Sequence, residues 1–147
     1  MKTMTMLTLL LTFMSLNINA DTDPRFHIQK VVTDSYVNGA FNDLNTNAMR
    51  KGFHKDFEIY SVSGEEIGRF SIDNWIATVE KRKTSPDFDP IKYQYDYTFL
   101  NIDADGNAGT VKIEFSQNNR VVFTDYLLLL KFRTGWKIVS KVFHSRN

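Results

Sequence analysis

The sequence predicts an α+β fold in which three N-terminal helices pack on a curved, mainly antiparallel sheet and form a cone. Two observations predict it: apolar residues recur mostly at helical spacing before residue 84, and they alternate with polar residues after Pro90. The chain has 147 residues, 14% of them aromatic, with only seven Gly and three Pro. Such a composition is typical of a folded core, so we expect one domain over residues 21–147.

The first twenty residues are expected to be a secretory signal peptide. Lys2 precedes an apolar run over residues 6–16, and Ala20 supplies a small residue at the expected cleavage point. The run is shorter than the ~20 residues of a membrane-spanning helix. A short membrane anchor is the alternative. We expect a secreted or periplasmic protein that has no membrane association after signal removal.

Three helices are predicted in the first part of the chain. The first starts with an Asp-Pro pair at residues 23–24, and its apolar spacing continues to about residue 43. The second is short, is capped by Asn45 or Thr46, and ends at Gly52. The third begins after Ser71, which is expected to be its N-cap. Its apolar positions i, i+3, i+4 and i+7 are Ile72, Trp75, Ile76 and Val79.

Strands are predicted on both sides of the third helix. Before it, residues 57–62 form a strand, and a turn at residues 63–66 leads into another. After it, four strands are expected at residues 91–99, 111–116, 121–132 and 136–144. Residues 121–132 are apolar on both faces except for Thr124 and Asp125, which is typical of a central strand or of one that a partner covers.

Composition excludes several classes of function. The 18 Lys and Arg balance 17 Asp and Glu along the whole chain, so no basic stripe for nucleic acid is expected. The chain has no Cys and three scattered His, so no metal site and no cofactor are expected. Asp103 to Asn107 imitate the start of a calcium loop, but Ala108 stands where such a loop needs Gly, and a hairpin turn explains the segment better.

The chain resembles the nuclear transport factor 2-like superfamily, and within it the branch described as "putative lumazine-binding". The matching stretches are residues 31–36, 52–57, 123–127 and 136–143. The resemblance implies a cone-shaped pocket and dimerisation through the sheet. The superfamily contains ketosteroid isomerases, polyketide cyclases and dehydratases beside many non-enzymatic binding domains, so the fold does not decide the function.

The resemblance to the isomerases identifies two candidate hydrogen-bond donors. Tyr36 matches their oxyanion-hole tyrosine, and Asp125 matches their protonated aspartic acid. Asp125 also lies within an apolar strand, where an ionised carboxylate needs a partner. The alternative is a structural Asp that is bonded to the backbone or to Lys141. The isomerase base falls at Ser61, and serine is no useful base near neutral pH without an activating neighbour.

His54 is the possible substitute base, although a lone His at the start of a strand is more often structural. The residues we expect around the pocket are Tyr36, His54, Tyr60, Ser61, Trp75, Asp125 and Lys141. A further stripe of Tyr93, Tyr95 and Tyr97 has three interpretations: core, dimer surface or aromatic wall.

Three hypotheses follow. The first is an exported domain that binds a small hydrophobic or heteroaromatic ligand without turning it over. The resemblance implies that it forms homodimers through the sheet. The second is an isomerase, cyclase or dehydratase that uses Tyr36 and Asp125 as hydrogen-bond donors and His54 for proton transfer. The third is a dimeric interaction module whose exposed sheet binds a protein partner.

Overall fold

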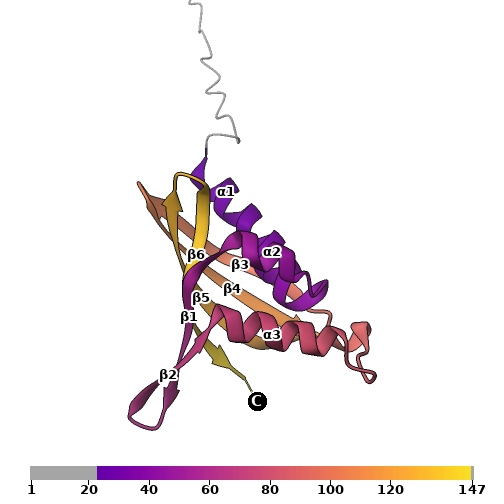
Figure 1. Cartoon of the computed structure of the whole chain (residues 1–147). Helices are drawn as coiled ribbons and strands as arrows, with labels where there is room; N and C mark the ends of the chain where they lie inside the picture. The colour runs from indigo at the N-terminus through magenta and orange to yellow at the C-terminus, as the bar shows by residue number, and fades with distance from the viewer. Residues whose placement is uncertain (1–22, 147) are drawn as a thin grey trace, which may run out of the picture.

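The computed structural model describes residues 23–146, so the predicted signal peptide lies outside the described residues. Helices cover one face of a single curved sheet, and the hairpin of β1 and β2 projects beyond them (Figure 1). Within the described residues, no helix is long and apolar enough to cross a membrane. The α+β cone predicted from the sequence is confirmed.

The helices begin where the sequence places their caps. They are α1 (Pro24–Val31), the π-helix η2 (Val32–Asn42), α2 (Thr46–Gly52), α3 (Ile72–Lys83) and the 3₁₀ helix η3 (Pro90–Tyr93). The side chains of Asp23, Asn45 and Ser71 accept hydrogen bonds from backbone N–H groups of the first turns of α1, α2 and α3. The predicted first helix is therefore one continuous path that changes from α to π geometry at Val32.

Six strands form the sheet, in the order β2-β1-β6-β5-β4-β3. Their bounds are β1 Phe53–Ser63, β2 Glu66–Ser71, β3 Asp96–Asp105, β4 Ala108–Gln117, β5 Arg120–Phe132 and β6 Gly135–Ser145. All neighbours are antiparallel except β1 and β6, which run parallel. The prediction that residues 121–132 form a central strand is confirmed, since β5 lies between β6 and β4.

The prediction of a strand from residue 91 is wrong at its start. Residues Pro90–Tyr93 form η3, and β3 begins only at Asp96. The cause is local: the side chain of Asp89 accepts a hydrogen bond from Ile91 N at 3.0 Å, and Pro90 has no N–H to give to a strand neighbour. The tyrosine stripe is therefore broken, because Tyr93 lies in η3 and Tyr97 in β3.

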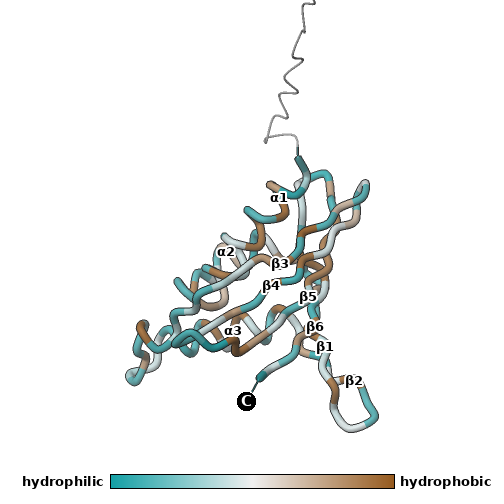
Figure 2. Tube along the Cα trace, turned by 180° about the vertical axis from the view of Figure 1, so that it is seen from behind, coloured by the Kyte–Doolittle hydropathy of each residue, from teal (hydrophilic) through white to brown (hydrophobic). Residues whose placement is uncertain are grey.

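The hydrophobic core lies between the helices and the concave face of the sheet. Apolar residues of η2 and α3 meet the inward members of the strand alternation, which include Ile113, Phe115, Leu127 and Leu129. Figure 2 shows the trace from behind, where apolar and hydrophilic positions follow one another along the strands. We call the helix-covered side of the sheet the inner face and the opposite side the outer face.

Candidate functional site

Tyr36 reaches the core from the middle of η2. Long π-helical segments are rare and occur often at functional sites, because each extra residue redirects the side chains that follow. Tyr36 is fully buried. Its ring makes edge contacts with four aromatic rings, at centroid distances of 5.3 Å for Phe41, 6.2 Å for Phe53, 5.7 Å for Trp75 and 5.4 Å for Phe115. The hydroxyl is the polar end of an aromatic cage.

Two charged side chains of the sheet meet that hydroxyl. Asp125 of β5 and Lys141 of β6 both face inward and are buried, with 0% and 6% of their surface exposed. The Tyr36 hydroxyl donates a hydrogen bond to Asp125 Oδ2. Lys141 Nζ donates to Tyr36 Oη at 2.7 Å and lies 3.2 Å from Asp125 Oδ2. We call Tyr36, Asp125 and Lys141 the buried triad.

The buried triad leaves one acceptor open. Asp125 Oδ1 is buried and has no hydrogen-bond partner among the described residues. A buried carboxylate oxygen without a donor is costly, and native structures contain few of them. The open oxygen therefore marks where a donor group of a ligand would be favourable.

Burial and neighbouring charge shift the pKa values of Tyr36 and Lys141. Burial raises the pKa of Tyr36 well above its usual value of 10.0, and the Asp125 carboxylate raises it further. Burial lowers the pKa of Lys141 from its usual 10.5, whereas Asp125 opposes that change. Tyr36 is thus a neutral donor at physiological pH.

Aromatic faces support the Lys141 ammonium. Its Nζ lies 5.0 Å from the ring centre of Tyr36, 5.4 Å from Trp75 and 4.8 Å from Phe143. These distances are within the range of cation–π attraction. Phe143 is 40% exposed, so it is the solvent-facing neighbour of an otherwise enclosed amine. Access to the triad would pass this ring.

The match to known proteins covers the residues that build this site. Residues 24–144 match a protein family described as "Putative lumazine-binding". The chain belongs to this family. The matched range contains Tyr36, Asp125 and Lys141, so the buried triad lies wholly inside it.

Solved structures and a curated relative extend the comparison. An NTF2-like protein of unknown function from Methylobacillus flagellatus KT has a TM-score of 0.62 and 26% identity, over 92% of this chain and 100% of that chain. A second, from Silicibacter pomeroyi DSS-3, has a TM-score of 0.62 and 21% identity, over 82% of this chain and 93% of that chain, and shows the fold alone. A protein named Aldolase FrzH from Cladobotryum sp is 33% identical over 97 residues, which are 65% of this chain and 72% of that protein.

The structure brings four of the seven expected pocket residues together: Tyr36, Trp75, Asp125 and Lys141. His54 lies elsewhere, because its ring stacks on Phe132 at a centroid distance of 4.9 Å and its Nδ1 accepts a hydrogen bond from Asp56 N. Proton transfer by His54 to a group held by the triad has no support from this placement.

Tyr60 and Ser61 also lie apart from the triad. Tyr60 pairs with Val142 in the β1–β6 register, whereas Ile59 pairs with Lys141, so Tyr60 is on the outer face. The structure therefore does not bring Tyr60 to the triad, since neighbouring residues along a strand point to opposite faces. Ser61 is exposed and pairs with Gly68 in the projecting hairpin.

Phe115 is a cage residue that the sequence analysis missed. Its ring contacts Tyr36 and Phe41, with a centroid distance of 4.8 Å to Phe41. The signal was present, because Phe115 is an inward member of the alternation Val111, Ile113 and Phe115. Within residues 23–146, no group of three His, Asp or Glu side chains is arranged to hold a metal ion.

Proposed function

We propose that this protein binds a small apolar or heteroaromatic molecule inside the cone, with its polar edge on the buried triad. The observation that carries the proposal is Asp125 Oδ1, an acceptor without a partner inside an aromatic cage. Replacing such buried ion pairs by apolar residues is often neutral or stabilising, so stability alone is a poor reason to keep one. The family description and the NTF2-like fold support a small ligand.

The ligand would replace side chains that now close the site. Aromatic rings of Phe41, Phe53 and Trp75 contact Tyr36, and Phe143 lies over Lys141. A flat molecule that carries an N–H or O–H donor suits both the aromatic walls and the free oxygen of Asp125. Movement of the exposed Phe143 ring would admit it.

Thermal denaturation with lumazine and with 2-naphthol tests the proposal. At one hundred times its dissociation constant, a ligand stabilises the native state by about 2.7 kcal/mol. We expect the increase in Tm to disappear in the double variant Asp125→Leu with Lys141→Met, which removes both charges together. Asp105→Asn, in an exposed hairpin turn, is the matched control and should keep the increase. No increase with either compound, or with related heteroaromatic compounds, would contradict ligand binding in the cone.

Aldol-type chemistry is a second candidate function, favoured by the relative named Aldolase FrzH together with the composition of the triad. Asp125 Oδ1 would take a proton from the carbon next to a ketone, and the electron pair would move to the ketone oxygen. Tyr36 and Lys141 would stabilise the resulting enolate by hydrogen bonds. The enolate carbon would then add to an aldehyde, whose oxygen receives the proton.

Proton exchange at carbon measures the first of these steps. Acetone in D₂O should exchange its protons faster with the wild type than with the double variant or with Tyr36→Phe. His54→Ala should leave the rate unchanged, since His54 lies on the outer face against Phe132. Equal rates with and without protein would reject the enzymatic candidate and leave the binding proposal intact.

We also propose that the protein is exported and forms homodimers through the outer face. The apolar run at residues 6–16 supports export. Mass spectrometry of the purified native protein tests it, and Asp21 is the expected N-terminal residue.

The dimer is supported by apolar side chains that are exposed on neighbouring strands, namely Tyr126, Leu128, Leu130 and Val142. The same surface would serve a protein partner if the chain proves monomeric.

A further inference from the structure

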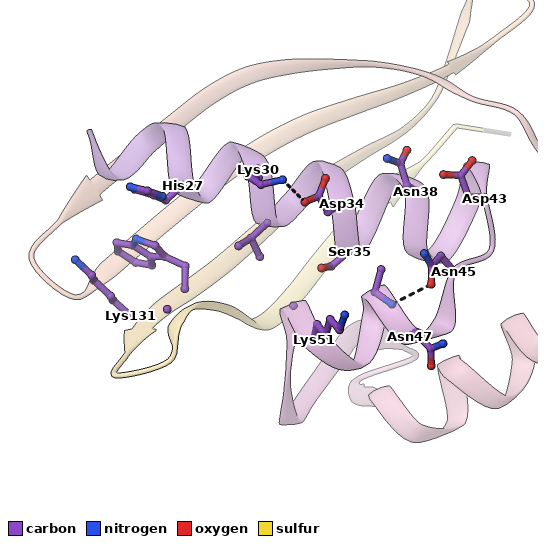
Figure 3. Close-up of a pocket in the computed structure, with 15 residues that line it drawn as sticks. His27, Lys30, Asp34, Ser35, Asn38, Asp43, Asn45, Asn47, Lys51 and Lys131 are labelled. Carbon is purple, nitrogen blue, oxygen red and sulfur yellow. Dashed lines mark hydrogen bonds and ion pairs between the residues drawn. The ribbon is translucent and has the colours of Figure 1, made fainter. Parts of the chain in front are cut away.

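A cavity lies outside the cone. It has a volume of about 720 Å³ and lies between the α1–η2 path, α2 and the turn that joins β5 to β6 (Figure 3). The volume is within the range of small-molecule pockets. None of the three triad residues lines it. We call it the helix cleft, and its chemistry is independent of the proposed function.

One part of the helix cleft is cationic. His27 and Lys131 lie near each other at one end, with Lys51 farther along the cleft (Figure 3). Lys30 is neutralised by Asp34, 2.7 Å away. Within residues 23–146, the ammonium groups of Lys51 and Lys131 have no hydrogen-bond or ion-pair partner. Two lysines are thus available to an anion.

Trp136 adds an unmet donor to the wall of this cleft. It is 4% exposed, and its Nε1 is buried without a partner in the described structure. Its Cζ3 edge packs towards Gly109, 3.3 Å from where a Cβ of residue 109 would stand. An indole N–H only donates, and its missing partner must be an acceptor such as a carboxylate oxygen.

Amide side chains line the other end of the helix cleft. Asn38, Asn45 and Asn47 lie there together with Asp43 (Figure 3). Asn45 Oδ1 accepts a hydrogen bond from Ala48 N at 3.1 Å, so its amide group is held in place. Amide and carboxylate groups pair well with hydroxyl groups, which both donate and accept.

We propose that the helix cleft binds a small hydroxylated carboxylic acid, of the sugar-acid type. The carboxylate would lie at the end of the cleft that holds Lys131, and the hydroxyl groups would extend along the cleft towards Lys51 and the asparagines. The charge-assisted bond from Lys131 to the carboxylate would supply most of the affinity.

The two tryptophans of the chain report the two sites separately. Trp75 contacts Tyr36 in the cone, and Trp136 lines the helix cleft. In ¹⁵N-labelled protein each gives one indole N–H signal, which Trp75→Phe assigns. Titration with glucuronate should shift the Trp136 signal in a saturable way and leave the Trp75 signal in place.

Charge variants then test the assignment. Lys131→Gln should weaken glucuronate binding by roughly tenfold or more, and Lys51→Gln should weaken it by less. Lys81→Gln, at an exposed position of α3, is the matched control and should bind glucuronate as the wild type does. An unchanged Trp75 signal verifies that each variant is folded.

Three results would overturn the proposal. They are a Trp136 signal that does not respond to glucuronate, equally strong binding of neutral glucose, and equally strong binding of inorganic phosphate. Lumazine binding in the cone should instead move the Trp75 signal, so failure of one site is distinguishable from failure of the other.

Discussion

Each face of β5 and β6 carries residues that are unusual for it, because two charged side chains are buried on the inner face and several apolar ones are exposed on the outer face. On the inner face, Asp125 and Lys141 are charged and lie in the core. On the outer face, Tyr126, Leu128 and Val142 are apolar and are 46%, 51% and 48% exposed. Both features cost free energy in the isolated chain. Burial of Asp125 and Lys141 costs desolvation of their charges, and exposure of the outer face costs hydration of apolar surface. The comparison supports the proposed ligand on the inner face and the proposed dimer contact on the outer face.

The largest effect is expected from breaking the inner pair. Asp125→Ala leaves the Lys141 ammonium buried without its carboxylate, so the free energy of unfolding should fall by about 3–5 kcal/mol. Asp125→Leu combined with Lys141→Met removes both charges and should recover most of that loss. Urea denaturation of the three proteins measures the difference. A double variant as unstable as Asp125→Ala would mean that the pair is needed for the fold itself.

Adjacent leucines of β5 compare the faces directly. Leu127 is buried on the inner face, so Leu127→Ala should lower the free energy of unfolding by about 2–5 kcal/mol. Leu128→Ala, on the outer face, should change it by less than about 0.5 kcal/mol at low protein concentration. Equal losses in urea denaturation would show that the outer face is covered within the monomer.

Alkaline pH should affect the inner face through Tyr36. Its pKa is raised in the folded state, so above pH 10 the unfolded chain loses a proton that the folded chain keeps. The free energy of unfolding should therefore fall by about 1.4 kcal/mol per pH unit until the folded pKa is reached. Lys141 has the opposite sign, because its lowered pKa makes stability rise with pH up to about 10.5. Between pH 10 and 11, the free energy of unfolding should fall less steeply with pH for Tyr36→Phe than for the wild type. Denaturation at several pH values measures both slopes, and equal slopes would reject the assignment.

The smallest effect on stability is expected on the outer face. Leu128→Lys should leave the unfolding of the monomer within about 0.5 kcal/mol of the wild type, since the site is half exposed. Its effect should appear in sedimentation velocity, as loss of the dimer. Ala77→Lys, at an exposed position of α3, is the control and should remain dimeric. A wild-type chain that sediments as a monomer at all concentrations would contradict the dimer.

Local signals made most of the fold predictable. Asp23, Asn45 and Ser71 begin helices because their side chains satisfy nearby N–H groups, which depends on a few neighbouring residues. Strand alternation was equally informative over β4. It failed at Ile91, where a competing side-chain bond from Asp89 closes a 3₁₀ turn that alternation alone does not reveal.

The site was less predictable because it depends on register between distant strands. Asp125 was detected as a charge in an apolar strand, and Lys141 as its possible partner. Tyr60 lies on the outer face because it follows Ile59, which pairs with the inward Lys141. The π geometry around Tyr36 has no recognised sequence signal, since it arises from packing.

The parallel pairing of β1 with β6 has a consequence for folding during synthesis. Phe53 pairs with Ile138 and Tyr60 with Val142, so β1 has only β2 beside it until the final strand has left the ribosome. Contacts this distant in sequence form slowly and leave strand edges exposed in the meantime. A chain that ends before β6 would keep two separate sheets, β2-β1 and β5-β4-β3, with an unpaired edge on each. Premature termination before Gly135 should therefore yield an aggregation-prone product.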